Sequence, residues 1–98
     1  MTRPIARKGD REAVHCSRPY RKGHFLTVFA NGIQVSGDGH LNTTHTKECK
    51  CPPCCCPHNA ALKATTSTVF AEGIRIGRVG DKTCTVVVQG SPNVFVGA

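Results

Sequence analysis

The sequence predicts a small all-β domain of short hairpins with pseudo-threefold symmetry, whose loops converge on a tip held by a metal ion. Three observations predict it. The chain is rich in Val and Thr, with Gly and Pro spread along it, and this composition favours short strands over helices. No window of about 11–18 residues shows the apolar period near 3.6 that marks an amphipathic helix. A hairpin-like segment also recurs along the chain, and the five His and seven Cys all lie between its copies.

The recurring segment reads Thr-Val-Phe-Ala-x-Gly-Ile and occupies 27–33 and 68–74. Side chains alternate between faces along a strand, so the Val or the Phe points inward, and the Gly allows a tight turn. We expect a second short strand after each turn, over 33–35 and 74–79. Gly37-Asp38 and Gly80-Asp81 should end these strands, because Gly tolerates positive φ and Asp bonds to nearby backbone.

A third unit is divided between the two ends of the chain. Val94-Phe95 lies near the C-terminus and Gly9-Asp10 near the N-terminus. The spacing from Phe to Gly-Asp is seven residues in the first copy, nine in the second and eleven across the joined chain ends. These similar lengths predict one unit used three times around an axis, with the two termini close together. Such symmetry is what a single chain needs if it caps a homotrimer.

A chain of 98 residues forms one domain, 1–98, with a thin hydrophobic core. Small domains of this kind need an additional crosslink, either disulfides or a metal. Seven Cys cannot all pair within one chain, and the N-terminal residues lack the apolar region of a signal peptide. We therefore expect synthesis in the reducing cytoplasm, where thiolates hold metal more often than they form disulfides. No apolar run approaches the roughly 20 residues needed to cross a bilayer.

The net charge of +7 indicates attraction to anionic surfaces such as phospholipid, lipopolysaccharide or nucleic acid. The basic residues are spread thinly, apart from Arg18, Arg21 and Lys22 around Tyr20. Aromatic residues do not alternate with basic ones in the way that stacks bases. A solvated basic surface is the simplest interpretation.

Three kinds of segment match the pattern of one known family. Pro4-Ile5-Ala6-Arg7, followed by Gly9-Asp10, reads as a proline-alanine-alanine-arginine motif with Ile5 in place of the first Ala. Residues 90–97 read GSPNVFVG, and the two Thr-Val-Phe-Ala-x-Gly segments repeat internally. These features resemble the motif, the C-terminal signature and the repeated strand of PAAR-repeat proteins, over nearly the whole chain. The copy that begins at Thr27 departs from the pattern, because it has Gln34-Val35-Ser36 in place of the motif and is two residues shorter than the corresponding run from Arg75 to Val79. The Cys-rich stretch 49–58 is also not typical of the family.

The resemblance implies a conical protein that binds the blunt end of a trimeric β-helical spike, in type VI secretion systems and contractile phage tails. It also implies a tip held by zinc through three His and one Cys. His15 and Cys84 match the first-loop His and the last-loop Cys, and His45 and His58 match the two remaining positions. Alternative ligands are His40, Cys51, Cys54 and Cys56. Iron is an alternative to zinc.

Three imidazoles and one thiolate form a closed tetrahedral zinc site without a position for water, so such a site is structural. His24 is not expected to bind metal, and Cys16, next to His15, should point the other way. The Cys-rich stretch leaves three interpretations open. It could hold a second metal through Cys51-x-x-Cys54 and its neighbours, form disulfides after leaving the cell, or be a stiff Pro-rich loop with free thiols.

These observations predict a structural tip protein without enzymatic activity. Residues expected to contact the spike are Val28, Phe29, Val69, Phe70, Val94 and Phe95. The expected partners are a homotrimeric spike, with one copy of this chain per trimer, and the target cell envelope; no small-molecule substrate or specific nucleic acid is expected. Made in the cytoplasm without a signal peptide, the protein would lie at the tip of a virion tail or baseplate, or be secreted with a bacterial injection apparatus. The alternative is a small zinc-dependent nucleic-acid-binding module, which the charge favours and the scarcity of aromatic residues opposes.

Overall fold

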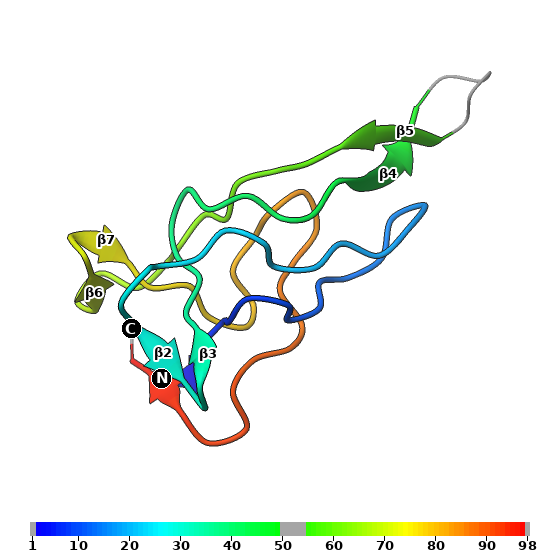
Figure 1. The fold of residues 1–98 in the computed structure, drawn as a ribbon. Coiled ribbons are helices and arrows are strands. Elements are labelled where there is room, and N and C mark those ends of the chain that lie inside the picture. Colours follow the sequence, from blue (N-terminus) through cyan, green and yellow to red (C-terminus); the bar gives the residue numbers. More distant parts are fainter. Residues whose placement is uncertain (1, 50–54, 98) are drawn as a thin grey trace.

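The computed structural model describes residues 2–49 and 55–97. This part of the chain is all-β and contains no helix, and therefore no helix long and apolar enough to cross a membrane. The strands are β1 (Arg3–Pro4), β2 (Phe29–Ala30), β3 (Ile33–Gln34), β4 (His45–Glu48), β5 (Cys55–His58), β6 (Phe70–Ala71), β7 (Ile74–Arg75) and β8 (Phe95–Val96). They form four antiparallel pairs, β1–β8, β2–β3, β4–β5 and β6–β7 (Figure 1). The predicted fold class of short hairpins is confirmed.

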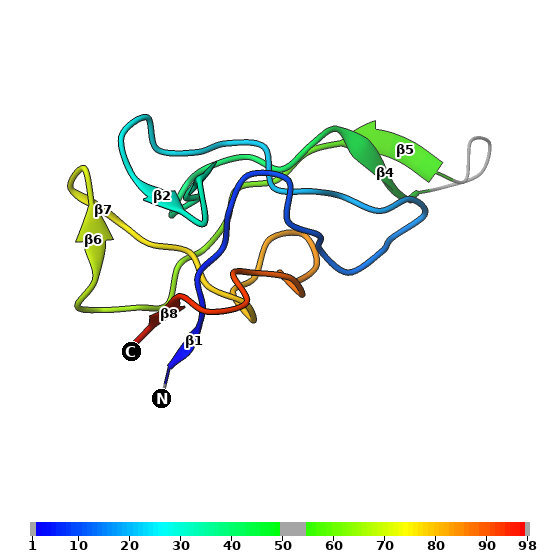
Figure 2. The same cartoon turned by 60° about the horizontal axis from the view of Figure 1, so that its bottom comes forward.

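Three of the four pairs are copies of one hairpin. Phe29 pairs with Gln34, Phe70 pairs with Arg75, and Phe95 pairs with Pro4. In the third copy the two strands come from opposite ends of the chain, and the termini lie side by side in Figures 1 and 2. The prediction of a unit split across the termini is therefore confirmed.

The two continuous hairpins turn through Asn31-Gly32 and Glu72-Gly73. All four residues have positive φ, at 57° and 73° in the first turn and 50° and 79° in the second. Two consecutive residues with φ > 0 make the turn whose twist matches that of the flanking strands, which explains the Gly at the second position.

A closed ring of backbone hydrogen bonds marks the threefold axis. The amide of Ser36 donates to the carbonyl of Ala6 at 3.0 Å, and the amide of Gly77 donates to Ser36 at 3.0 Å. The ring closes where the amide of Ala6 donates to Gly77 at 2.9 Å. Each residue belongs to a different unit and all three are buried. A single chain thus places three equivalent backbone segments around one axis.

The hydrophobic core surrounds this axis and is built from equivalent positions of the three units. In each unit one core residue directly precedes the ring residue, and these are Ile5, Val35 and Ile76. Another directly follows the Phe of the strand, and these are Ala30, Ala71 and Val96. Phe25 completes this buried cluster, with Val28 and Val69 packed against it. The alternation predicted for the Val-Phe pairs is resolved here: Val28 and Val69 lie toward the core, and the neighbouring Phe side chains lie outward.

One expected turn is wrong. The unit that begins with β2 ends at Gly39-His40, not at Gly37-Asp38, because Gly9, Gly39 and Gly80 share the same conformation, with φ of 86°, 81° and 92°. Nine residues therefore separate Phe29 from Gly39, the same number as between Phe70 and Gly80, and this unit is not shorter.

His40 occupies the position of the turn Asp and performs the same task. Its Nδ1 accepts a hydrogen bond from the amide of Gly37 at 2.8 Å. A carboxylate oxygen of Asp10 accepts from the amide of Arg7, and one of Asp81 from the amide of Arg78, both also at 2.8 Å. The expectation that His40 is an alternative metal ligand is therefore wrong, because the imidazole is used in this turn.

The exchange of Asp for His follows from the packing of Phe25. In the unit formed by the two chain ends the Arg7 guanidinium pairs with Asp10 at 3.1 Å. In the unit that begins with β2 a Gly stands where Arg would be, and a Cβ at Gly37 would lie 2.5 Å from Phe25 Cζ. The Phe25 and His40 rings instead meet edge to face, with centroids 4.8 Å apart. An aromatic pair thus replaces an ion pair.

We expect His40 to make the stability depend on pH. Burial, with Arg21 as the next cause, lowers the pKa of His40 from its ordinary value of 6.5. Below pH 6.5 the unfolded chain therefore takes up a proton that the folded chain excludes, so the stability should fall as the pH is lowered from 6.5 toward the folded pKa.

Urea unfolding at pH 7.5 and 5.5 measures this, with His40→Asn as the matched variant. An Asn oxygen can accept from Gly37 without titrating, so the loss of stability on acidification should be smaller in His40→Asn. The histidines of the metal site are present in both proteins, so their contribution to the pH dependence of stability is the same in both. Identical pH dependence of the two proteins would contradict this role.

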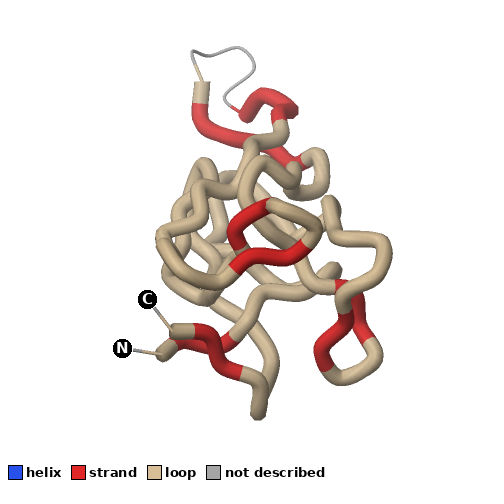
Figure 3. Tube along the Cα trace, turned by 90° about the vertical axis from the view of Figure 1, so that its left-hand side faces the viewer, coloured by secondary structure: helices blue, strands red, loops and turns tan. Residues whose placement is uncertain are grey.

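The loops that follow the three turns start from equivalent hydrogen bonds but differ in length. The amides of Arg21, Leu62 and Val87 donate to the carbonyls of Asp10, His40 and Asp81 at 2.8, 3.0 and 3.0 Å. These bonds close loops 11–20, 41–61 and 82–86. The longest loop carries the β4–β5 hairpin, which projects away from the three small hairpins in Figures 1 and 2 and makes the molecule elongated, 43 × 26 × 24 Å. Figure 3 looks from the side of the three small hairpins, which lie apart from one another, with β4–β5 behind and above them.

Candidate metal centre

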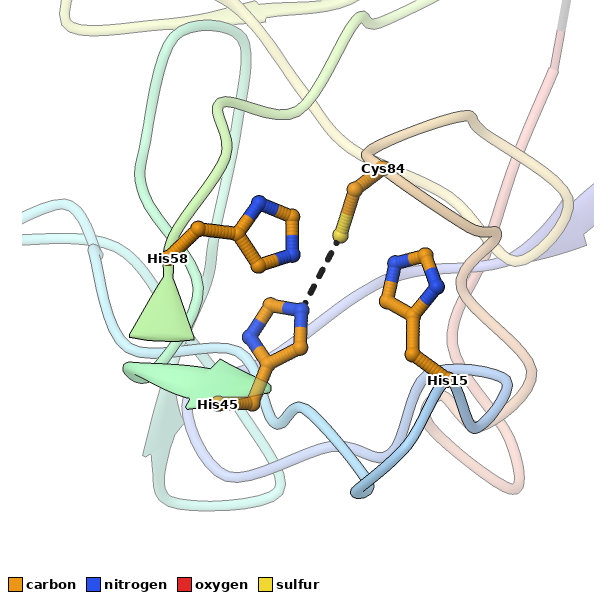
Figure 4. A group of neighbouring side chains, drawn as sticks. All are labelled: His15, His45, His58 and Cys84. Atoms are coloured by element: carbon orange, nitrogen blue, oxygen red, sulfur yellow. Dashed lines mark hydrogen bonds between the residues drawn. The ribbon is translucent and has the colours of Figure 1, made fainter. Parts of the chain in front are cut away.

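The three loops bring together four side chains that could hold a metal ion. His15 comes from loop 11–20, His45 and His58 from loop 41–61, and Cys84 from loop 82–86. One ligand atom from each lies within 4.8 Å of all the others. Figure 4 shows the three imidazole rings and the thiol facing a common centre. The structure thus assembles the four residues that the resemblance implied as ligands.

The register of the β4–β5 hairpin places two of the imidazoles together. His45, the first residue of β4, pairs directly with His58, the last residue of β5. Directly opposed residues project from the same face of an antiparallel pair, and here the ring centroids are 4.3 Å apart. The His15 ring stacks on His45 from the neighbouring loop, with a centroid distance of 5.3 Å.

A backbone carbonyl fixes the protonation of His45. Its Nδ1 lies 2.8 Å from the carbonyl oxygen of Thr43, and a carbonyl only accepts, so Nδ1 carries the proton. In the neutral ring Nε2 then has a free lone pair, and it lies 3.2 Å from Cys84 Sγ. Metal-binding histidines are typically oriented by such a hydrogen bond on the other ring nitrogen.

Two further nitrogen atoms at the centre are buried without a partner. Nε2 of His15 and Nε2 of His58 are buried and have no hydrogen-bond partner in the described part of the chain. An unsatisfied buried polar atom costs free energy, and a metal ion would satisfy both at once. The donor set and these two atoms therefore fit a metal ion.

The surroundings of His58 favour the neutral form of its imidazole. Burial is the largest cause, followed by the neighbouring His45, and together they lower the pKa of His58 below its ordinary value of 6.5. Only the neutral imidazole can bind a metal. The ring is therefore in its ligand form at neutral pH.

The four atoms match the donors of a closed tetrahedral site. Bonds of about 2.0–2.1 Å to nitrogen and about 2.3 Å to sulfur place ligand atoms roughly 3.3–3.6 Å apart in a tetrahedron. The present spread of up to 4.8 Å requires the loops to draw together slightly. With four protein ligands, such a site crosslinks three loops and has no open position for a reacting water.

One of the alternative thiol ligands forms a disulfide instead. Cys56 forms a disulfide with Cys49, so the expectation that it could bind the metal is wrong. Cys51 and Cys54 lie outside the described residues. His24 lies apart from the cluster, with Nδ1 3.0 Å from the carbonyl oxygen of Phe25.

Four cysteines of the described chain form two disulfides, whereas the sequence favoured metal binding by thiolates in general and left disulfides open for the Cys-rich stretch. Cys16 pairs with Cys55 and Cys49 pairs with Cys56, and Cys84 is the free thiol among them. Cys55 and Cys56 are neighbours on β5 and so project to opposite faces. These four sulfurs therefore do not converge on one ion, which favours the disulfide interpretation of the Cys-rich stretch.

The Cys16–Cys55 disulfide crosslinks loops 11–20 and 41–61, two of the three loops that carry the metal ligands. Cys16 follows His15, and Cys55 begins the strand that His58 ends. A disulfide closing a loop of this size contributes about 2–4 kcal/mol by restricting the unfolded chain. The projecting hairpin is thus held to loop 11–20 by a covalent bond beside the candidate metal centre.

A buried polar group beneath the site was not foreseen from the sequence. Asn42, which also contacts Cys84, and Thr83 both donate a hydrogen bond to the carboxylate of Glu12. Each follows the turn residue of its unit by two positions, after Asp10, His40 and Asp81. The signal was therefore present but was hidden by the misplaced second turn.

The residues expected to bind a spike lie on the small hairpins. Phe29, Phe70 and Phe95 are equivalent by register and are 56%, 55% and 53% exposed. Val94 is also exposed, whereas Val28 and Val69 pack against the core. The three Phe side chains are thus the most exposed large apolar side chains on the strands of the three hairpins.

No protein-family model matches the chain, and no curated protein matches it either.

Proposed function

We propose that this chain is a non-enzymatic tip protein that caps the end of a homotrimeric β-helical spike, one chain per trimer, and is held rigid by a zinc ion. The observation that carries the proposal is the set of three equivalent hairpins around one axis, each with an outward Phe. The resemblance to PAAR-repeat proteins leads to the same function.

Symmetry is the first argument. The end of a homotrimer offers three identical surfaces, and a single chain can contact all three in the same way only if it repeats itself three times. The ring formed by Ala6, Ser36 and Gly77 provides such an axis. The exposures of the three Phe side chains differ by only a few per cent, from 53% to 56%.

The exposed apolar surface of the hairpins is the second argument. Besides the three Phe side chains, Ile33 and Ile74 are each 38% exposed on β3 and β7. Large apolar side chains that recur exposed at equivalent positions of a small protein are suited to an interaction surface. Two-residue strands with unpaired edges can also continue the strands of a β-helix through backbone hydrogen bonds.

The choice of zinc follows from the donor set. Three imidazole nitrogens and one thiolate suit a tetrahedral zinc ion, and harder oxygen-preferring cations are disfavoured. A narrow end has too little volume for a hydrophobic core, so a metal crosslink is an effective way to make it rigid. Zinc would thereby tie the three loops together at the end where β4–β5 projects.

The setting we propose is a contractile injection apparatus, as a virion tail or as a bacterial secretion system, with the target cell envelope as second partner. The net charge of +7 would assist contact with an anionic envelope. In this role the protein transmits force and carries out no reaction.

Co-expression with a homotrimeric β-helical spike protein from a contractile tail tests the proposal. Native mass spectrometry of the purified complex should give one copy of this chain for three spike chains. A complex with three copies for three spike chains, or no complex with spikes from either kind of apparatus, would argue against a cap.

A further inference from the structure

We propose that Asn42 is a positioning residue of the metal centre, which donates a hydrogen bond to the Cys84 sulfur, and that a buried Glu12–Arg21 ion pair holds it in place. This inference rests on the proposed binding of a metal by Cys84 and the three histidines.

The Asn42 amide is fixed in one orientation. The side chain is fully buried, and its Nδ2 lies 3.0 Å from a carboxylate oxygen of Glu12 and 3.5 Å from Cys84 Sγ. Its Oδ1 accepts from the amide of Ala60 at 2.7 Å. A carboxylate only accepts and a backbone amide only donates, so the NH2 group must face Glu12 and the sulfur.

Glu12 is held in turn by a fully buried ion pair. Its second carboxylate oxygen lies 2.8 Å from Arg21 Nη1, and both side chains are 0% exposed. The remaining guanidinium nitrogens donate to Ser36 Oγ at 3.1 Å and to the carbonyl of His40 at 2.6 Å. Ser36 belongs to the ring at the threefold axis, so the network runs from that axis to the metal centre.

The same carboxylate also reaches the loop that carries the thiol. Thr83, the residue before Cys84, donates to Glu12 Oε1 at 2.6 Å. Glu12 thus bonds to side chains from both other loops, Asn42 and Thr83. Buried ion pairs are a weak source of stability in themselves. The Glu12–Arg21 pair instead has a specific task, which is to position the thiol and its hydrogen-bond donor.

The chemistry of the sulfur explains why the donor matters. A thiolate bound to a metal carries negative charge, and an N–H donor directed at it stabilises that charge relative to the protonated thiol. Partners of this kind orient the ligand and tune the metal, and their loss typically reduces metal affinity about 10- to 100-fold. The 3.2 Å contact between Cys84 and His45 Nε2 would be replaced by metal bonds, whereas the Asn42 contact remains compatible with them.

Asn42→Leu tests the inference, because leucine fills a similar volume and cannot donate. Zinc affinity is measured by competition with a chelator, and the cobalt(II) form reports the sulfur directly through its thiolate-to-metal charge-transfer band. We expect about 10- to 100-fold weaker zinc binding and a shift of the band to lower energy.

Asn42→Ser is the second variant. Its short hydroxyl should favour folding but does not reach the sulfur, so the same band shift is expected.

Thr66→Val is the matched control. Thr66 is fully buried and its hydroxyl donates to the carbonyl of Gly97, so the variant loses a buried hydrogen bond near the chain termini. It should melt at a lower temperature with unchanged zinc affinity and an unchanged band. If Asn42→Leu and Asn42→Ser bind zinc and show the band as the wild type does, the positioning role is overturned. If the wild type binds no metal, the metal site itself is refuted, which is a distinct result.

Discussion

Replacing Cys84 by alanine is expected to abolish metal binding and to lower the melting temperature by about 20 °C or more. Structural zinc contributes roughly 10–16 kcal/mol of apparent binding free energy in small domains, which is comparable to the whole stability of such a domain. Losing even about 5 kcal/mol of it lowers the melting temperature by about 20 °C or more, since each kcal/mol shifts it by about 4–8 °C at this size. Elemental analysis and thermal melting measure both effects.

His15→Ala should behave in the same way, because Cys84 and His15 come from different loops and each is needed to close the crosslink. The buried Nε2 of His15 has no other partner in the described chain that could compensate. His24→Ala is the matched control, since His24 lies outside the cluster. This variant should keep its metal and most of its stability. Full metal content with unchanged melting in Cys84→Ala or His15→Ala would remove that residue from the site.

Replacing Phe29, Phe70 or Phe95 by alanine is expected to weaken binding to the spike about 10- to 100-fold in each case. Burying a Phe side chain in an interface contributes about 1.5–3 kcal/mol, and each 1.4 kcal/mol is about a tenfold change in affinity. The three effects should be similar, because the three positions are equivalent by register. Titration calorimetry or surface binding to the purified spike trimer measures them.

The stability of these Phe variants should change little, since each side chain is more than half exposed. Val14→Ala is the matched control: Val14 is 56% exposed like the Phe side chains, but it lies on loop 11–20, away from the hairpins. Its affinity should equal that of the wild type. A large effect from one Phe alone would indicate an asymmetric contact and would contradict capping of a threefold spike.

The repeated hairpins could be predicted from the sequence because they are local. A Val-Phe strand, a Gly turn and a returning strand lie within a few residues, so their spacing is visible without a structure. The split unit followed from counting, and the pairing of Pro4 with Phe95 confirms it. The cluster of His15, His45, His58 and Cys84 could be expected once the resemblance assigned each residue to a loop.

Other features depend on contacts between distant residues and could not be read from the chain. The second turn was misplaced because His40 does the work of an Asp only in the presence of Phe25, which occupies the space of the missing Arg side chain. The Cys49–Cys56 disulfide depends on the register of β4 with β5, which pairs Cys56 with Lys47 and so brings it near Cys49, just past the end of β4, only after the hairpin forms. The role of Glu12 was hidden as well, because its equivalence with Asn42 and Thr83 appears only when the second turn is placed at Gly39-His40. Its ion-pair partner Arg21 comes from another part of the fold.

X-ray absorption spectroscopy at the zinc edge of the purified protein tests the central claim most directly, together with the number of zinc ions per chain. The geometry predicts one zinc per chain, surrounded by three nitrogen atoms and one sulfur atom. A shell of four sulfur atoms would place the metal among the other cysteines. That result, or a folded and stable protein without bound metal, would contradict a tip crosslinked by His15, His45, His58 and Cys84.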